Sequence, residues 1–274
     1  MNSVKVNCGN IEISNDNKIC IIAGPCQLET EQHAMDMAGK IQEITNKFNL
    51  GFIYKTSFDK ANRTSIKGKR GAGLETSLPI FDKIKKELNI PVLTDIHNVE
   101  QCSIVSKHAD VLQIPAFLCR QTELLLEAGR SGLTVNIKKG QFMSHDAMGF
   151  AVEKVKSTGN DKVWLCERGN SFGYNDLIVD ATSMTKLKAH NVPVIMDCTH
   201  AVQKPNQTSG VTGGDPSLIS TIVFSAVATG ADGLFIETHP NPAAAKSDPF
   251  TMLKLDLLRP ILEKAMKIRT ALGQ

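Results

Sequence analysis

Residues 193–200 read PVIMDCTH, a short apolar run with polar side chains at its carboxyl end. The apolar part is only about five residues long and is apolar on both alternations, which is typical of a parallel strand covered on both faces. Similar runs recur along the chain. They are Cys20–Gly24, Gly51–Thr56, Pro91–Asp95, Val111–Pro115, Leu133–Lys138, Val163–Glu167 and Gly233–Glu237. With Pro193–Asp197, the sequence therefore predicts eight parallel strands.

Helical patterns separate these runs. Asn98 followed by Gln101 resembles a capping box, Asp215-Pro216 is a typical helix start, and a last helix is expected over Thr251–Leu272. Units of roughly 32 residues and a total of about 250 residues match a (β/α)8 TIM barrel. An open doubly wound sheet is the rival architecture, and the lack of a GxGxxG pattern after the first strand disfavours it.

The amino-terminal segment is expected to lie outside the repeating pattern. Val4–Asn15 alternates apolar and polar residues around Cys8-Gly9-Asn10, which predicts a β-hairpin within residues 1–17. This hairpin could plug the bottom of the barrel. No change of composition marks a linker, so residues 1–274 are expected to form one domain.

The composition excludes several classes of protein. The chain has 274 residues, 42% of them hydrophobic, and a formal net charge of +3. These values argue against disorder, and a basic stripe for nucleic acid is missing. Seven cysteines are too few for a disulfide scaffold. Neither a signal peptide nor an apolar stretch of about 20 residues occurs. We expect a soluble cytoplasmic protein that binds neither nucleic acid nor membranes.

Basic side chains stand at separate strand ends, where barrels of this type carry their active sites. They are Lys55 with Lys60 and Arg63, Lys138, and Arg168. Charged groups in strands are costly unless they are paired or liganded, so this group predicts a mouth that binds phosphate or carboxylate. The simpler interpretation is that each residue is a solvated loop side chain.

A second constellation is Cys26, His200, Glu237 and Asp248. These residues follow the first, seventh and eighth strands, which are neighbours in a closed barrel. One thiolate, one imidazole and two carboxylates suit a divalent metal such as Zn, Fe or Mn. Each residue also has a simpler interpretation. Cys26 could be a packed small side chain and His200 a hydrogen-bonded or catalytic histidine. Glu237 could pair with a lysine, and Asp248 could cap the final helix.

Other residues have structural interpretations or open ones. Cys198 is expected to be structural, and Phe235 a core residue. His97 and His239 are candidates for the second shell of the site. The glycine-containing loop Ser209–Asp215 could be a lid, a phosphate cradle or an ordinary loop.

Several motifs together resemble the 3-deoxy-D-manno-octulosonate 8-phosphate synthase family over nearly the whole chain. They are KTSFDKANRTS (55–65), VLQIPAFLCR (111–120), NIK (136–138) with Gln141-Phe142, CERGNSFGY (166–174), DCTHAVQ (197–203) and LFIETHP (234–240). The KANR segment is the most specific, because the related synthase of seven-carbon products has a KPR-type motif there.

The resemblance implies a (β/α)8 barrel, usually a homotetramer, that condenses phosphoenolpyruvate with arabinose 5-phosphate in lipopolysaccharide precursor biosynthesis. Water cleaves the C–O bond and inorganic phosphate leaves. The family has a metal-dependent branch with Cys at the end of strand one and a metal-independent branch with Asn there. Cys26 places the chain with the metal-dependent branch, with no organic cofactor.

The same resemblance implies roles for individual residues. Lys138 and Arg168 would hold the phosphate of phosphoenolpyruvate with Lys55 nearby, while Lys60, Ser57 and Gln113 would take its carboxylate. Asn62, Arg63 and Thr64 or Ser65 would hold the pentose phosphate, Ala116 would contact substrate, and Arg120 would reach a neighbouring subunit's site. Cys26, His200, Glu237 and Asp248 would ligate the metal. Lys60, Lys138, His200 and Asp95 would be the catalytic groups, with Asp95 near the substrate hydroxyls or a water.

Two alternatives stay open. A 3-deoxy-D-arabino-heptulosonate 7-phosphate synthase would use erythrose 4-phosphate in place of the pentose. A non-catalytic barrel that binds sugar phosphates or stores metal would share the fold without the reaction, since fold does not fix function.

Overall fold

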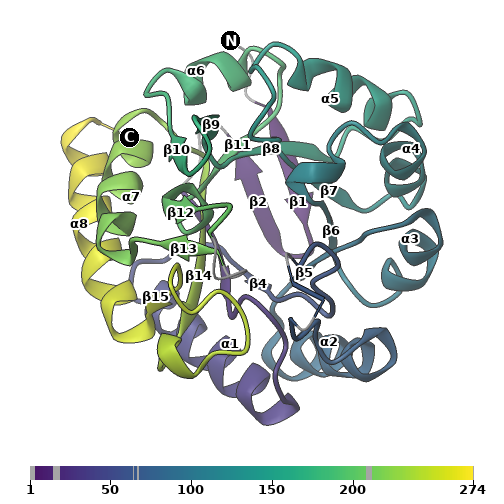
Figure 1. Ribbon diagram of the computed structural model, residues 1–274, viewed down its shortest axis with the longest axis horizontal. Helices are drawn as coiled ribbons and strands as arrows, with labels where there is room; N and C mark the ends of the chain where they lie inside the picture. The colour runs from purple at the N-terminus through teal and green to yellow at the C-terminus, as the bar shows by residue number, and fades with distance from the viewer. Residues whose placement is uncertain (1–3, 15–18, 64, 67, 208–211, 274) are drawn as a thin grey trace.

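A closed ring of eight parallel strands forms the centre of the molecule (Figure 1). The computed structural model describes residues 4–14, 19–63, 65–66, 68–207 and 212–273. The ring strands are β3 (Cys20–Gly24), β4 (Phe52–Lys55), β5 (Val92–Asp95), β6 (Val111–Ile114), β7 (Thr134–Lys138), β8 (Val163–Glu167), β11 (Val194–Asp197) and β14 (Gly233–His239). Pairing of β11 with β14 closes the ring. The prediction of a TIM barrel is confirmed.

Helices surround the ring on its outer face (Figure 1). They are α1 (Glu31–Asn46), α2 (Leu74–Leu88), α3 (Val99–Val105), α4 (Thr122–Arg130), α5 (Met148–Lys156), α6 (Ser183–Lys188), α7 (Ile219–Ala228) and α8 (Leu258–Ala271). Asn98 caps α3 by accepting from the amide of Gln101 at 3.0 Å. The Gln101 side chain accepts in return from the amide of His97 at 2.7 Å, one residue earlier than in a standard capping box. Among the described residues, no helix is long and apolar enough to cross a membrane.

The last helix begins later than the sequence predicts. Residues 251–257 are not α-helical. β15 (Leu253–Lys254) pairs in parallel with the end of β14, and a 3₁₀ turn, η5 (Leu255–Leu257), follows it. The buried Thr238 hydroxyl donates to the carbonyl of Leu253 at 2.9 Å. The expected start at Thr251 is therefore wrong, since a long-range pairing overrides the local apolar pattern there. Asp215 does act as a cap, but of the 3₁₀ turn η3 (Pro216–Leu218) that leads into α7.

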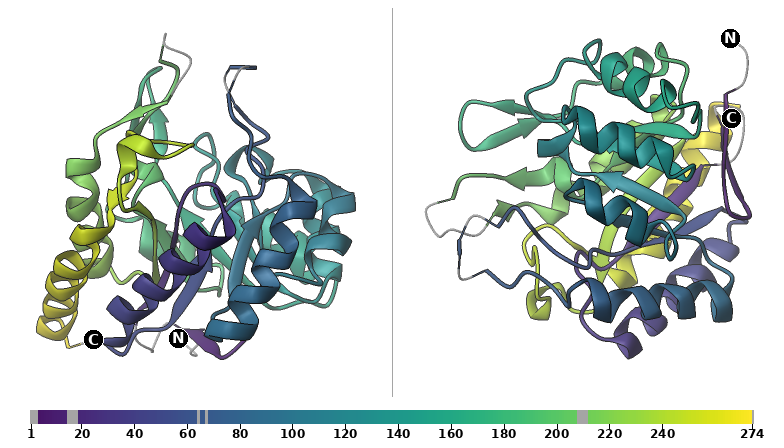
Figure 2. Two further views of the ribbon diagram at one scale, coloured as in Figure 1. Left: turned by 90° about the horizontal axis from the view of Figure 1, so that it is seen from below. Right: turned by 90° about the vertical axis from the view of Figure 1, so that its right-hand side faces the viewer.

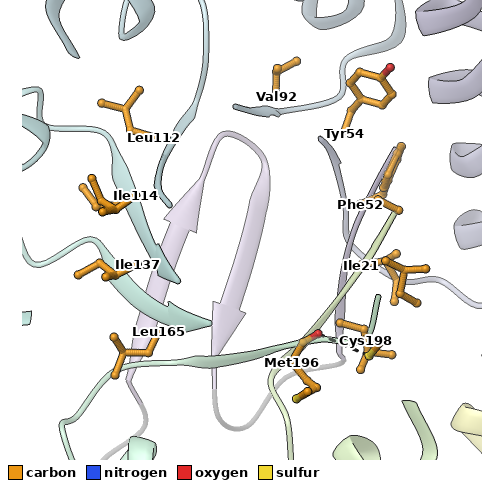
Figure 3. Close-up of a cluster of buried hydrophobic side chains, with 14 of the residues drawn as sticks. Ile21, Phe52, Tyr54, Val92, Leu112, Ile114, Ile137, Leu165, Met196 and Cys198 are labelled. Atoms are coloured by element: carbon orange, nitrogen blue, oxygen red, sulfur yellow. Dashed lines mark hydrogen bonds between the residues drawn. The ribbon is translucent and has the colours of Figure 1, made fainter. Parts of the chain in front are cut away.

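Two apolar cores lie on opposite faces of the ring. The outer core joins strands to helices, and Figure 3 shows members such as Ile21, Val92 and Ile137 pointing away from the barrel axis. Cys198 belongs to it, as expected of a structural cysteine. The inner core fills the barrel and includes Trp164 and Phe235, along with Ile22, Ile53, Leu93, Val111 and Ile195.

The amino-terminal hairpin closes one end of the inner core, as the sequence suggested. Strands β1 (Lys5–Cys8) and β2 (Ile11–Ser14) pair antiparallel, and Val6, Cys8 and Ile13 pack among the inward-facing barrel residues. The Thr134 hydroxyl donates to the carbonyl of Asn7 at 3.2 Å. Figure 2 shows the hairpin at the end of the barrel opposite the long loops.

Two small hairpins at the open end were not predicted from the sequence. β9 (Asn170–Phe172) pairs with β10 (Asp176–Ile178), and β12 (Gln203–Lys204) pairs with β13 (Gly213–Gly214). Both project beyond the carboxyl ends of the barrel strands (Figure 2). These strands are only two or three residues long, too short for an alternation pattern to reveal them.

Inward-facing positions change from apolar to polar within two residues along most barrel strands. Ile53 precedes Lys55, Leu93 precedes Asp95, Val111 precedes Gln113, Ile195 precedes Asp197, and Phe235 precedes Glu237. Two strand residues span about 6.6 Å. A thin boundary therefore separates the apolar interior from a polar floor at the carboxyl end.

Candidate active site

A cavity opens at the carboxyl end of the barrel, and basic and amide side chains line it. They are Lys55, Lys60, Asn62, Arg63, Gln113, Lys138 and Arg168, from four strands and the loop after β4. Ala116, His200 and Asp248 line the same cavity. The separate strand ends do converge on one mouth. A cavity with this lining is suited to phosphate and carboxylate groups.

The four predicted metal ligands meet in one corner of this mouth. Donor atoms of Cys26, His200, Glu237 and Asp248 all lie within 4.8 Å of one another. His200 Nε2 is 3.4 Å from Glu237 Oε2 and 3.8 Å from Asp248 Oδ2. Asp248 adopts a left-handed backbone conformation with φ of 47°, a sparsely populated region that tends to occur at functional sites.

The chemistry of this corner fits a divalent cation. His200 Nδ1 lies 2.8 Å from Asp197 Oδ2, so the Nδ1 proton points at Asp197 and leaves the Nε2 lone pair facing the carboxylates. Glu237 Oε2 is buried and has no hydrogen-bond partner among the described residues. Burial, Asp248 and Glu237 raise the pKa of the Cys26 thiol. A thiolate ligand there needs a positive charge beside it, which a metal ion supplies.

Lys55 belongs to the metal corner. It is almost fully buried, forms an ion pair with Glu237 Oε1 and donates to the carbonyl of Cys26 at 3.3 Å. Burial alone would raise the pKa of Glu237, but His200 and Lys55 hold it well below its usual range. Lys55 therefore fixes one carboxylate oxygen of Glu237 and leaves the other free. The backbone of Lys55 can lie this close to β3 only because residue 24 is a glycine. A Cβ at Gly24 would lie 2.0 Å from the carbonyl oxygen of Lys55.

A second polar chain links the loop after β4 to the end of β5. Lys60 donates to the Ser57 hydroxyl at 2.8 Å, and Ser57 donates to Asp95 at 2.5 Å. Burial would raise the pKa of Asp95, but Lys60 and the hydrogen bond from His97 keep it well below its usual range. Asp95 is therefore a carboxylate, and Lys60 keeps an ammonium group at the mouth.

Lys138, the last residue of β7, contacts His200 of the metal corner and its partner Asp197. Its ammonium is 2.5 Å from Asp197 and 3.4 Å from His200 Nδ1, and it sits 3.7 Å from the centroid of the Phe235 ring. The sequence predicts Asp197 only as the end of a strand. In the structure its carboxylate contacts both Lys138 and His200. The spacing of Asp197 and His200, three residues apart, was the available signal for this contact.

Arg168 is positioned by a buried carboxylate behind it. Glu167 Oε1 accepts from the amides of Arg168 at 2.8 Å and Gly169 at 2.6 Å. Lys139 and His145 lie 3.3 Å from the two oxygens of Glu167, and with the amides they lower its pKa to about 2 although burial would raise it. The Arg168 guanidinium reaches Gln203 and the carbonyl of His200. Sequence reasoning assigned no role to Lys139, His145 or Gln203.

Arg63 is held across the entrance. Its guanidinium donates to Gln27 at 3.1 Å and lies 3.7 Å from Asp248 Oδ1, and its Nε donates to the carbonyl of Lys69 at 3.0 Å. Arg63 is thus fixed beside the metal corner, with part of its donor capacity facing the cavity.

Some predicted residues are elsewhere or fall outside the description. Arg120 is exposed and does not line this cavity. Thr64 and residues 209–211 of the glycine-containing loop lie outside the described residues. Ser57 is fully buried and reaches the mouth only through Lys60 and Asp95.

His239 belongs to a separate group with Glu29 and His33, whose donor atoms also lie within 4.8 Å of one another. The amide of Asn241 donates to His239 Nδ1 at 3.0 Å. This contact places the ring proton on Nε2, which lies 3.6 Å from Glu29. With that tautomer Nε2 has no lone pair for a metal, so His239 offers no ligand atom to an ion in this group.

Comparison with known proteins identifies the family. A family model described as "DAHP synthetase I family" matches residues 3–273 of the chain. The chain belongs to this family. Similar proteins include one from Chelativorans sp. (strain BNC1). It is 49% identical over 262 residues, which cover 96% of this chain and 95% of the relative. A protein of Bartonella tribocorum (strain CIP 105476 / IBS 506) is 48% identical over 265 residues, covering 97% and 95%. One of Brucella ovis (strain ATCC 25840 / 63/290 / NCTC 10512) is 50% identical over 261 residues, covering 95% and 94%.

All three relatives are named 2-dehydro-3-deoxyphosphooctonate aldolase. The name describes a phosphorylated 3-deoxy sugar acid of eight carbons. The resemblance inferred from the KANR segment and its companion motifs is confirmed at the level of this group of DAHP synthetase I proteins.

Proposed function

We propose that this chain is an enzyme that condenses phosphoenolpyruvate with D-arabinose 5-phosphate and water, giving 3-deoxy-D-manno-octulosonate 8-phosphate and inorganic phosphate. The product would serve lipopolysaccharide precursor biosynthesis in the cytoplasm. One observation carries the proposal: a single cavity joins the cationic groups Lys60, Arg63, Lys138 and Arg168 to the cluster of Cys26, His200, Glu237 and Asp248. The names of the relatives at 48–50% identity support the same reaction.

Phosphoenolpyruvate would bind across the centre of the mouth. Lys138 and Arg168 come from adjacent strands and would hold its phosphate through charge-assisted hydrogen bonds. Lys60 and Gln113 would take the carboxylate, with the buried Ser57 acting through its contact with Lys60. Ala116 would contact the substrate from β6's side of the cavity. Two polyanions placed side by side need such a lining, and holding them in order is a large part of the catalytic task.

The pentose phosphate would bind nearer the entrance. Asn62 and Arg63 lie in the loop after β4 and line the outer cavity, and Thr64 or Ser65 would complete the phosphate site. Arg63 contacts Gln27 and Asp248, which would tie the phosphate site to the metal corner. Arg120 would complete the site of a neighbouring subunit in a homotetramer.

Cys26, His200, Glu237 and Asp248 would hold a divalent ion such as Zn, Fe or Mn. The bound ion would supply Lewis acidity toward the aldehyde or lower the pKa of a water. Lys55 would keep the Glu237 carboxylate oriented, and Asp197 would keep the His200 Nε2 lone pair turned toward the site. Asp95, an ionised carboxylate beside Lys60, would orient a substrate hydroxyl or accept a proton from water.

A phosphate-release assay tests the proposal. The protein is incubated with phosphoenolpyruvate and either arabinose 5-phosphate or erythrose 4-phosphate, with and without a strong chelator. We expect release with the pentose, suppression by the chelator and recovery on addition of a divalent ion.

Three outcomes would contradict it. Release with the tetrose alone would favour the heptulosonate 7-phosphate synthase. Binding of both substrates without turnover, with metal added, would favour a non-catalytic barrel. Full activity in the metal-free protein would remove the metal from the proposal.

A further inference from the structure

Phe235 lies where the apolar interior of the barrel meets the charged mouth. Its side chain is fully buried and belongs to the inner core. Glu237 follows two residues later on the same strand, and Asp197 pairs with Phe235 in the register of β11 and β14. The ring is therefore the last inward-facing apolar side chain of β14 before the polar floor, since Ile236 belongs to the outer core.

Two ammonium groups lie over this ring. Lys138 Nζ is 3.7 Å from the ring centroid, and Lys55 Nζ is 5.3 Å from it. The His200 ring is 5.9 Å away at an interplanar angle of 47°. A single aromatic side chain thus touches the lysine proposed to hold the phosphate, the lysine that fixes Glu237, and the histidine of the metal corner.

The face of an aromatic ring attracts a cation through its quadrupole, and this attraction is stronger where water is excluded. Phe235 is fully buried and Lys138 is almost fully buried, so water is already largely excluded from their contact. Lys138 has Asp197 and His200 as its polar contacts, and the ring face helps to hold its ammonium where an anionic substrate would meet it. An aliphatic side chain at this position would offer no such attraction.

We propose that Phe235 is a positioning residue whose ring face holds the Lys138 ammonium in place for an anionic substrate. The inference rests on the proposed function, because it takes the phosphate of phosphoenolpyruvate as the group that Lys138 binds. It adds an electrostatic role to a residue that packing alone would explain. The ring acts through Lys138 and touches no substrate itself.

The test varies the charge on the ring face while keeping its shape nearly constant. Phe235 is replaced in the full chain by 4-fluoro-, 3,5-difluoro- and 3,4,5-trifluorophenylalanine, and by Phe235→Leu. Each added fluorine weakens the quadrupole. We expect the dissociation constant of phosphoenolpyruvate, measured by calorimetry, to rise stepwise through the series, reaching about tenfold for the trifluoro and Leu variants. That limit corresponds to the loss of one cation–π contact between buried groups, since a factor of ten is about 1.4 kcal/mol.

The same substitutions at Phe81 serve as the control. Phe81 is fully buried in the outer core, and no cation lies over its ring in the part of the chain that the structure describes. Thermal unfolding of both series reports packing effects. The Phe81 series should change unfolding without changing affinity for phosphoenolpyruvate.

Equal affinity across the Phe235 series would overturn the inference, as would a loss in Phe235→Leu alone, since that pattern tracks shape. Wild-type protein that binds phosphoenolpyruvate but releases no phosphate with any acceptor would instead contradict the proposed reaction. The stepwise rise of the dissociation constant across the fluorinated series would then still test the role of Phe235. Wild-type protein that binds no phosphoenolpyruvate would overturn both.

Discussion

The two ends of the barrel interior are made by the same eight strands and have opposite chemistry. At the closed end, Val6, Ile13 and Trp164 pack in a dry core under the hairpin. At the open end, ion pairs such as Lys138–Asp197 and Lys55–Glu237 lie in the same inward rows. The change takes two residues along a strand. The closed end therefore stabilises the fold, while the open end can vary in chemistry without disturbing the strands below it.

The largest expected effect comes from replacing one paired lysine at each end of the barrel by methionine. Lys138→Met removes a mouth cation and leaves Asp197 buried without it, and we expect phosphate release to fall about 10³-fold, the upper range for loss of one preorganised electrostatic donor. Lys188 pairs with Asp232 at 2.8 Å beside the first residue of β14, at the closed end. Lys188→Met should reduce folding stability but leave kcat within about twofold. Equal kinetic losses in the two variants would contradict the division between the ends.

Acid sensitivity provides a second comparison. The folded-state pKa of Glu167 is about 2, below its ordinary value of 4.5, so its contribution to stability is complete above about pH 4.5 and is lost as pH falls toward 2. The shift corresponds to about 3 kcal/mol. Glu167→Gln should remove this part of the pH dependence in urea titrations between pH 5 and pH 2.5. Lys267 also lowers the pKa of Glu263, but that pair is exposed and screened by solvent, so Glu263→Gln should change the profile much less. A wild-type profile in Glu167→Gln would refute the assignment.

Two buried cysteines separate metal binding from packing. Cys26→Ala should weaken metal affinity by about 100-fold or more, because loss of a ligand costs at least as much as loss of a residue that orients one. Cys198→Ala, in the outer core, should keep the metal and lose only stability. Metal content after dialysis against a competing chelator distinguishes them. Cys26→Asn should keep some metal-independent activity, and a folded but inactive Cys26→Asn protein would count against that expectation.

The smallest expected effect lies at the closed end. Ile13→Val removes one buried methylene from the hairpin and should cost about 1 kcal/mol in the free energy of unfolding. Both kcat and KM should stay within about twofold of wild type. Ile11 is only partly buried on the same strand, so Ile11→Val should cost less. A change of KM in Ile13→Val would show that the inner core transmits packing changes to the mouth.

Local patterns were sufficient to predict the barrel. Eight short apolar runs fixed the number of strands, and the alternation around Cys8-Gly9-Asn10 predicted the hairpin. The predicted start of the last helix was wrong, because Leu253 pairs with Thr238, 15 residues earlier in the chain. Hydrophobic periodicity does not encode such a contact. The hairpins at the mouth were missed because their strands are too short to show a period.

The site was predictable only as far as strand ends could be aligned. Residues at the carboxyl end of a strand, such as Lys55 and Lys138, could be placed at one mouth from topology alone. Their partners could not. Asp197 and Glu167 were visible as strand ends, but which lysine each one contacts depends on the direction of its side chain, inward for Asp197 and outward toward Lys139 for Glu167.

Three of the mouth cations pair with nearby carboxylates, and this has a consequence for how substrates arrive. Lys55 lies against Glu237, Lys138 against Asp197, and Arg63 near Asp248. Such pairs cancel one another's potential beyond a few ångströms, so these three cations add little to the field that the mouth projects into solution. An approaching anion gains little guidance from them at a distance and is recognised by them only on contact. Their contribution to the rate of encounter should therefore depend weakly on ionic strength, as expected of groups that select by fit after collision.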